Sequence, residues 1–543
     1  MGVFDWLFGK RREEPGEPLQ QFPWDRRPSI YEHLKAHVRS GQKGLAEGGQ
    51  TLPDEAQIAA KSTVRWAAGA MDGVSTHHMG GKNTDEASQL LKLVRTYSTS
   101  PTVRNKAKVY EFLVENHVVS AIDPFLEALR EEAAVNHERV YDLARSFATE
   151  SPAREPVKFG IALLGLFGQE QDIDILRTIG RHEEFTLFCA VALGNSCEDG
   201  ESELWELAKH VDGWGRIHLV ERLSKTENPD IKDWLIREGY KNSIMFEYLA
   251  YPCAVGGSLL EAMETDEIDD DLLLSAAEII KALIVGGPAE NMDDYEDGAV
   301  VTHLFLNQME KGRSALSEFQ AVNAIRVFLS EKEADWQARG NRGWTVEKRE
   351  EMLRQCSAIT QQPHWRDRVL TGLRSEDDVE FDLAGRAAAV LQIDAWPFHW
   401  DRLKKEPLQA GRWFGVMQDC NDSRIADVVA LAESSLPLQQ IASGPSTAIG
   451  LGPGYEAHSS LGFILQDLGR FPRHGMRLVE AGLQCSTIRN RNMALKALSE
   501  WGKDKWPANI VSLLKEASER EPDQEVRRRI DNAIAGRPLD ENE

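Results

Sequence analysis

The sequence of 543 residues has few cysteines, and none of its apolar runs reaches membrane length. The six cysteines stand far apart and form no Cys-x-x-Cys pair; they are Cys189, Cys197, Cys253, Cys356, Cys420 and Cys485. This spacing argues against a disulfide framework or a structural zinc site, and it is typical of isolated thiols in a reducing compartment. Because a membrane helix needs about 20 apolar residues, we expect no transmembrane segment.

The N-terminus does not have the order of charges that a secretory signal requires. Its basic residues Lys10, Arg11 and Arg12 follow the apolar residues of the first nine positions, whereas in a signal peptide they precede them. Residues 13–28 contain four prolines, which is typical of a linker. We therefore expect a cytoplasmic protein that begins with a short apolar and basic head.

Positive charge is scarce. Acidic residues outnumber basic ones by 87 to 63, and the net charge is −24. Because proteins bind the phosphates of nucleic acids mainly through lysine and arginine, we expect no nucleic-acid partner. Residues 261–297 hold thirteen acidic residues and one basic residue, Lys281. This segment is interpreted as a solvated face or as a contact for a basic partner.

Strand-like alternation of apolar and polar residues never extends beyond four or five positions. Without strands between its helices, the chain cannot form a doubly wound nucleotide-binding domain. The glycine- and proline-rich stretch 443–454 lacks the Gly-x-Gly-x-x-Gly spacing of such domains, and no strand precedes it. Ser446 lies in a near match to a nucleophile elbow, but a turn that lines a cleft is the alternative.

Motifs for metal ions are also missing. None of the fourteen histidines follows a glutamate by three positions, which excludes the Glu-x-x-His pairs of di-iron bundles. His137 and His182 each precede a glutamate but lack the second histidine of a helical zinc site. Residues 293–298 resemble a calcium loop, yet Tyr295 takes a ligand position and Leu304 stands where the bidentate glutamate belongs.

Helical patterns are present throughout, and they are clearest over residues 486–536. The first helix there carries Leu495, Leu498 and Trp501 on one apolar face, with Gly502 suited to end it. Apolar residues at the same spacing predict two further helices. Arg489 follows Ile488 as Arg527 follows Val526, which gives an offset of 38 residues.

This stretch resembles HEAT-like repeats, and the resemblance implies an all-α chain folded as an α-solenoid of antiparallel helix pairs. A chain of this length also exceeds one ordinary core, as a solenoid or a multi-domain protein would. The predicted segments are the head and linker 1–28, the N-terminal helical repeats 29–260, the acidic interruption 261–300 with one helix, the middle repeats 301–442, the glycine- and proline-rich loop 443–457 and the HEAT-like repeats 458–543.

The candidate catalytic residues are Asp72, His77 and His78, which lie in a glycine-flanked loop between two predicted helices. A helix stop needs glycine but does not need two histidines. A carboxylate hydrogen-bonded to one imidazole could fix its tautomer and leave the other ring for a proton or a metal ion. The alternative is a buried turn whose polar groups are satisfied internally.

These observations lead to two hypotheses about function. The first is a cytosolic scaffold that binds a protein or peptide partner on the concave face of the repeats. The second is an enzyme on the same frame that uses either the loop of Asp72, His77 and His78 or the loop 443–454. HEAT-like DNA glycosylases and phycobilin lyases show that such a frame can host chemistry. Residues 450–501 are also similar to bacterial proteins labelled limonene hydroxylases, which implies a monooxygenase. No motif in the sequence identifies a cofactor.

Overall fold

The computed structural model describes residues 24, 27–39, 41–61, 66–76, 81–265, 267–287, 289–450 and 454–540. Over these residues the chain contains helices and no β-strand, apart from isolated bridges that join Val38 to Leu45 and Ala448 to Thr487. The predicted all-α class is confirmed for this part of the chain. In the same residues, no helix has both the length and the apolar character needed to cross a membrane.

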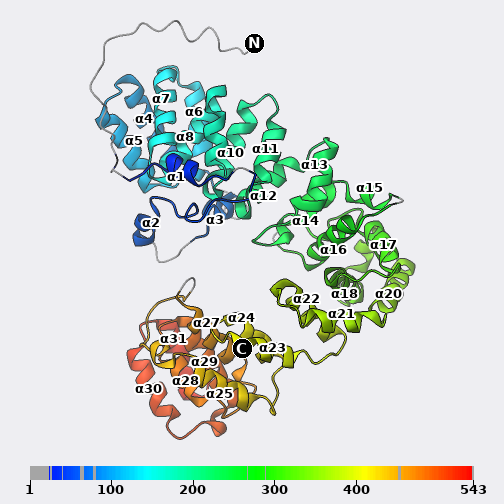
Figure 1. Cartoon of the computed structure of the whole chain (residues 1–543). Helices are drawn as coiled ribbons and strands as arrows, with labels where there is room; N and C mark the ends of the chain where they lie inside the picture. The colour runs from blue at the N-terminus through cyan, green and yellow to red at the C-terminus, as the bar shows by residue number, and fades with distance from the viewer. Residues whose placement is uncertain are drawn as a thin grey trace. The chain divides into compact units, whose positions relative to one another are not determined.

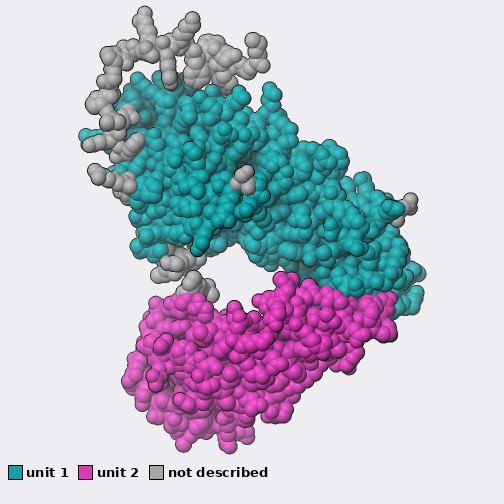
Figure 2. Space-filling model, viewed as in Figure 1, with its two compact units in different colours: residues 1–360 teal, residues 361–543 magenta. Residues whose placement is uncertain are grey.

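The chain divides into two compact units, Met1–Thr360 and Gln361–Glu543, which are coloured separately in Figure 2. The α-helices of the first unit (Figure 1) are α1 (Ile30–His37), α2 (Glu55–Lys61), α3 (Ala70–Val74), α4 (Thr84–Thr99), α5 (Val103–Glu115), α6 (Ile122–Glu131), α7 (His137–Glu150), α8 (Arg154–Phe167), α9 (Ile173–Ile179), α10 (Glu183–Ser196), α11 (Gly200–Ala208), α12 (Gly213–Leu223), α13 (Pro229–Trp234), α14 (Ala250–Gly256), α15 (Leu259–Met263), α16 (Asp270–Val285), α17 (Gly298–Met309), α18 (Leu316–Ser330), α19 (Trp336–Asn341) and α20 (Val346–Thr360).

The α-helices of the second unit are α21 (His364–Gly372), α22 (Asp378–Val390), α23 (Trp396–Lys405), α24 (Ala410–Gln418), α25 (Ile425–Ser435), α26 (Leu438–Ile441), α27 (Glu456–Leu468), α28 (Met476–Leu483), α29 (Ile488–Trp501), α30 (Ile510–Arg520) and α31 (Gln524–Ala535). Short 3-10 turns lie between some of the helices, for example Val118–Ser120 before α6 and Lys503–Lys505 after α29. A π-helical turn, Leu235–Gly239, follows α13.

In the first unit, each helix of an alternating series packs against the next member of that series. The series runs through α8, α10, α12, α14, α16, α18 and α20, and α7 packs against the start of it at α8. The intervening α9 and α11 also contact α10. A chain whose helices pack mainly against near neighbours in sequence buries its apolar faces step by step, without one central core.

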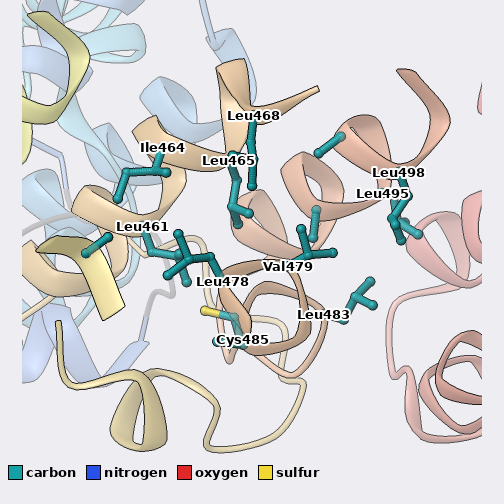
Figure 3. Close-up of a cluster of buried hydrophobic side chains, with 14 of the residues drawn as sticks. Leu461, Ile464, Leu465, Leu468, Leu478, Val479, Leu483, Cys485, Leu495 and Leu498 are labelled. Atoms are coloured by element: carbon teal, nitrogen blue, oxygen red, sulfur yellow. The ribbon is translucent and has the colours of Figure 1, made fainter. Parts of the chain in front are cut away.

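The second unit packs in the same sequential way, through α24, α27, α29 and α31. Its core is formed by aliphatic side chains of α27, α28 and α29 (Figure 3), among them Leu461, Leu465, Leu478 and Leu495. These residues recur at helical spacing, so each helix presents one apolar stripe to its neighbours.

Leu498 and Trp501 were predicted to be core residues, and this is confirmed. Leu498 has no exposed surface, and Trp501 is 3% exposed. The Trp501 indole Nε1–H donates to the carbonyl of Leu468 at 2.9 Å, which ties the end of α29 to the end of α27. The predicted end of the helix is also correct, because Gly502 adopts a positive φ of 77° directly after Trp501.

The acidic stretch 261–297 does not stand apart from the fold. It contains α16, whose buried residues include Leu273 and Ile280, and α16 packs against α14 and α18. Asp269 caps this helix by accepting a hydrogen bond from the Leu272 amide at 2.8 Å. Some of the negative charge is therefore used within the chain. The predicted division into six segments stays a prediction.

Candidate functional site

A cavity of about 440 Å3 lies beside the first turn of α8, and we call it the α8 cavity. Its walls come from α2, the segment before α3, the end of α5 and the starts of α8 and α10. Its charged lining residues are Arg27, Asp54, Glu55, Glu115, His117, Arg154, Glu155, Lys158 and Glu184. Its apolar lining residues include Ile58, Ala59, Trp66, Met71 and Val114. Binding sites commonly combine an apolar wall with a few convergent polar groups in this way.

The first turn of α8 is capped from a distant part of the chain. Ala153 precedes the helix and has no side chain that could cap it. Instead, the carboxylate of Asp54 accepts a hydrogen bond from the backbone amide of Arg154 at 2.8 Å. The Arg154 guanidinium also binds Asp54 at 3.0 Å and Glu55 at 2.8 Å. A negative charge is favourable at a helix N-terminus, so Asp54 fixes the start of α8 against α2.

One turn further along α8, the ammonium group of Lys158 is buried among carboxylates. Its Nζ lies 2.7 Å from Asp72 Oδ2, 2.7 Å from Glu184 Oε1 and 3.4 Å from Glu155 Oε1. Only 1% of this side chain is exposed. Burial alone would lower the pKa of Lys158, but the neighbouring negative charges outweigh it and hold the pKa well above its usual value. Lys158 is therefore a permanent cation and not a neutral nucleophile.

Glu184 connects the two cations of α8. It lies 3.5 Å from Arg154 Nη1 as well as beside Lys158, and it accepts a hydrogen bond from the Gly69 amide at 3.1 Å. Burial would raise the pKa of Glu184, but Lys158 and Arg154 outweigh this effect and lower it. We call the set Asp54, Glu55, Asp72, Arg154, Glu155, Lys158 and Glu184 the α8 ion cluster.

Asp72, one of the three predicted catalytic residues, belongs to this cluster. It is 2% exposed and lies behind Lys158, outside the lining of the α8 cavity. Burial raises the pKa of its carboxyl group to about 6, and the charges of Glu155 and Glu184 act in the same direction, while Lys158 opposes them. His77 and His78 lie outside the described residues, so the predicted catalytic loop stays a prediction.

His117 and Glu155 form a pair at the cavity wall. Nδ1 of the His117 imidazole lies 3.4 Å from Glu155 Oε1, and Glu155 also accepts a hydrogen bond from the Val118 amide at 2.8 Å. The hydrogen bond with Glu155 raises the pKa of His117. Burial would raise the pKa of Glu155, but Lys158, His117 and the Val118 amide lower it to about 2. Glu155 is therefore ionised beside an imidazole whose pKa it raises.

The other sequence candidates have structural roles. The ring of His182 caps α10 by accepting from the Glu184 amide at 3.2 Å, and burial lowers its pKa to about 4. Ser446 Oγ donates to the carbonyl of Ser486 at 2.9 Å and accepts from the Ala448 amide at 3.2 Å. Residues 451–453 of the same loop lie outside the described residues. Both side chains thus serve as local hydrogen-bond partners.

Sequence reasoning missed Arg154, Glu155 and Lys158. Asp54 and Arg154 are 100 positions apart, and no local motif links them. The sequence does contain a signal, because Lys158 is the only charged residue between Pro156 and Phe167 of this helix. A charged side chain on the buried face of a helix requires a partner of opposite charge.

The comparisons with known proteins give no further assignment. No family model matches this sequence, and no curated protein is significantly similar to it. Among the described residues, no group of three or more histidine, cysteine, aspartate or glutamate side chains could hold a metal ion. The candidate site therefore depends on the α8 cavity and the α8 ion cluster.

Proposed function

We propose that this chain is a HEAT-like α-solenoid that acts as a binding scaffold and holds a peptide segment of a protein partner in the α8 cavity. The sequential packing of alternate helices from α8 to α20 supports the solenoid. Solenoids commonly present extended surfaces to partners, with the binding residues on a rigid frame.

The observation that carries the proposal is the composition of the α8 cavity. Its volume of about 440 Å3 falls within the usual range for ligand sites, and it suits one or two side chains of a peptide instead of a folded domain. The ion pairs of Arg154 and Lys158 hold its polar wall in one geometry, so little ordering is needed when a peptide binds.

A selection experiment tests this function. Peptides that bind the purified protein would be selected from a random displayed library. Their affinities would then be measured for two variants of α5, Val114→Trp and Val103→Trp. Both valines are exposed, by 36% and 42%, but only Val114 lines the cavity. We expect Val114→Trp to weaken binding at least tenfold and Val103→Trp to leave it unchanged. Failure to select any peptide, or an affinity that Val114→Trp does not change, would overturn the proposal.

The second candidate function is an enzyme that uses Asp72, His77 and His78. Its specific form is an oxidoreductase similar to the proteins labelled limonene hydroxylases. The observation in its favour is the buried carboxyl group of Asp72, whose pKa of about 6 lies close to neutral pH. If this function is correct, the protein as purified contains stoichiometric metal or absorbs above 300 nm, and His77→Ala or His78→Ala removes that property. A colourless, metal-free protein contradicts the metal-dependent and chromophore-dependent forms of this function.

A further inference from the structure

The α8 ion cluster contains more negative than positive charge. Two permanent cations, Arg154 and Lys158, are shared by five carboxylates, which are Asp54, Glu55, Asp72, Glu155 and Glu184. Four of these carboxylates have side chains that are 11% exposed or less, and Glu55 alone is 42% exposed. Excess charge in a partly buried site is costly unless a proton or another cation compensates it.

At a pH below about 6, a proton on Asp72 supplies part of this compensation. Asp72 faces Lys158, Glu155 and Glu184. Its pKa is raised to about 6, so the carboxyl group keeps its proton below about that pH. His117 faces Glu155, with Lys158 and Asp72 nearby, and Glu155 raises its pKa. Burial is the largest cause of the raised pKa of Asp72, and the charges of Glu155 and Glu184 add to it, while the hydrogen bond with Glu155 is the largest cause for His117. A cation bound nearby would compete with the protons on both groups.

The lining of the α8 cavity as a whole also contains more acidic than basic side chains. Its carboxylates are Asp54, Glu55, Glu115, Glu155 and Glu184, and its cationic side chains are Arg27, Arg154 and Lys158, with His117 as the titratable base. Arg27 donates to the carbonyl of Pro53 at 3.1 Å and to Gln57 Oε1 at 2.6 Å. Since the acids outnumber the permanent cations, the lining attracts a cation and repels an anion.

The apolar part of the lining suits an alkyl chain. Ile58, Met71 and Val114 line the cavity, together with Trp66, which is 50% exposed. Long basic side chains bury their methylene groups on apolar surface and keep the charged end among polar groups. An exposed indole can also attract a cation through its ring face.

From these observations we infer that the α8 cavity selects a lysine or arginine side chain of the bound peptide. The alkyl stem packs on the apolar lining, and the charged end lies toward Glu115 and the carboxylates of the α8 ion cluster, of which Glu55 is the most exposed. This inference rests on the proposed function, because it specifies which residue the peptide inserts. An acidic or purely apolar side chain would leave the negative excess uncompensated.

The test uses three capped, alanine-based heptapeptides that differ only in a central lysine, methionine or glutamate. We expect the lysine peptide to bind the full chain at least tenfold more tightly than the methionine peptide, and the glutamate peptide to bind most weakly. Glu115→Gln should weaken the binding of the lysine peptide at least threefold. Glu111→Gln is the matched control, because Glu111 is also exposed on α5 but does not line the cavity.

The outcomes separate this inference from the proposed function. If the lysine and methionine peptides bind equally and both are lost in Val114→Trp, the cavity binds peptides without selecting a cation, and only the inference fails. If the glutamate peptide binds most tightly, or if Glu115→Gln and Glu111→Gln behave alike, the inference also fails. If none of the three peptides binds, the inference is overturned, and the library selection then decides the proposed function separately.

Discussion

The buried ion pairs of the two units differ in their charge balance. In the second unit, Arg491 meets Glu521 one to one, with both nitrogen–oxygen distances at 2.7 Å and each side chain 1% exposed. The remaining donors of Arg491 bind the carbonyls of Cys485, Ser486 and Ser446. In the first unit, the α8 ion cluster has more carboxylates than cations and borders a cavity.

This difference separates a structural role from the binding role that we propose for the α8 cavity. The pair of Arg491 and Glu521 is complete, and its contact with the Ser446 carbonyl holds the glycine- and proline-rich loop against the start of α29. The α8 ion cluster is incomplete in charge, and the cavity beside it leaves room for a further cation. A charge-balanced buried pair holds chain segments together, whereas an unbalanced one beside a cavity can also recognise a ligand.

The largest expected effect follows from Lys158→Met. This change leaves Asp72, Glu155 and Glu184 buried without their shared cation, so we expect a loss of about 5 kcal/mol or more of stability around α8. Native-state hydrogen exchange of the α8 amides measures it. The control Lys241→Met removes an exposed pair with Glu238 and should cost less than about 1 kcal/mol. Equal losses in the two variants would contradict the role assigned to Lys158. If Lys158→Met does not fold, adding Glu184→Gln should partly restore folding.

Glu521→Ala is expected to cost about 3–4 kcal/mol, because it leaves a single buried cation, Arg491, without its partner. Urea unfolding of the full chain, with hydrogen exchange of α29 amides, gives the value. The double variant Arg491→Met with Glu521→Leu removes both charges and should recover most of the loss. A double variant no more stable than Glu521→Ala would mean that the pair itself does not account for the loss.

Leu498→Ala provides an uncharged reference in the same unit. Because Leu498 is fully buried in the core of α27, α28 and α29, we expect a loss of about 3 kcal/mol from transfer and cavity formation. The same hydrogen-exchange measurement on α29 applies. A loss below about 1 kcal/mol would show that this helix is not packed as described.

Asp72→Asn tests, through the pH dependence of stability, the burial of this carboxyl group beside Glu155 and Glu184. Asp72 has a raised pKa in the folded chain, so its proton stabilises the fold at low pH, and this contribution is lost as the pH rises from about 4 to about 6. The change from 3.8 to about 6 corresponds to roughly 3 kcal/mol. Between pH 4 and 7 we therefore expect the wild type to lose about 2–3 kcal/mol relative to Asp72→Asn. Parallel stability curves for the two proteins would contradict this.

The sequence predicts the fold class and part of the core, because these depend on local periodicity. Leu498 and Trp501 are examples, since their helical spacing is visible within one element. The α8 ion cluster does not depend on local spacing. Asp54, Asp72 and Glu184 come from three separate elements and reach Arg154 and Lys158 only through tertiary packing.

Asp72 illustrates both the reach and the limit of sequence reasoning. Its position in a glycine-flanked loop made it a candidate for chemistry next to His77 and His78. The structure places its carboxylate 2.7 Å from Lys158, a residue 86 positions later in the chain, and no local pattern predicts this partner. In the loop 443–454, Ser446 is held by hydrogen bonds to Ser486 and Arg491, and the neighbouring Gly444 and Pro445 line a small pocket, as a turn beside a cleft would.

Proton release on peptide binding tests the central claim most directly. Isothermal titration of the central-lysine heptapeptide at pH 6, in buffers of different ionisation enthalpy, measures the number of protons exchanged. Because a bound cation lowers the pKa of both Asp72 and His117, we predict net proton release, which Asp72→Asn should reduce. The central-methionine peptide should release none. Proton uptake, or equal exchange for the two peptides, would contradict the account of the α8 cavity as a site for a basic side chain.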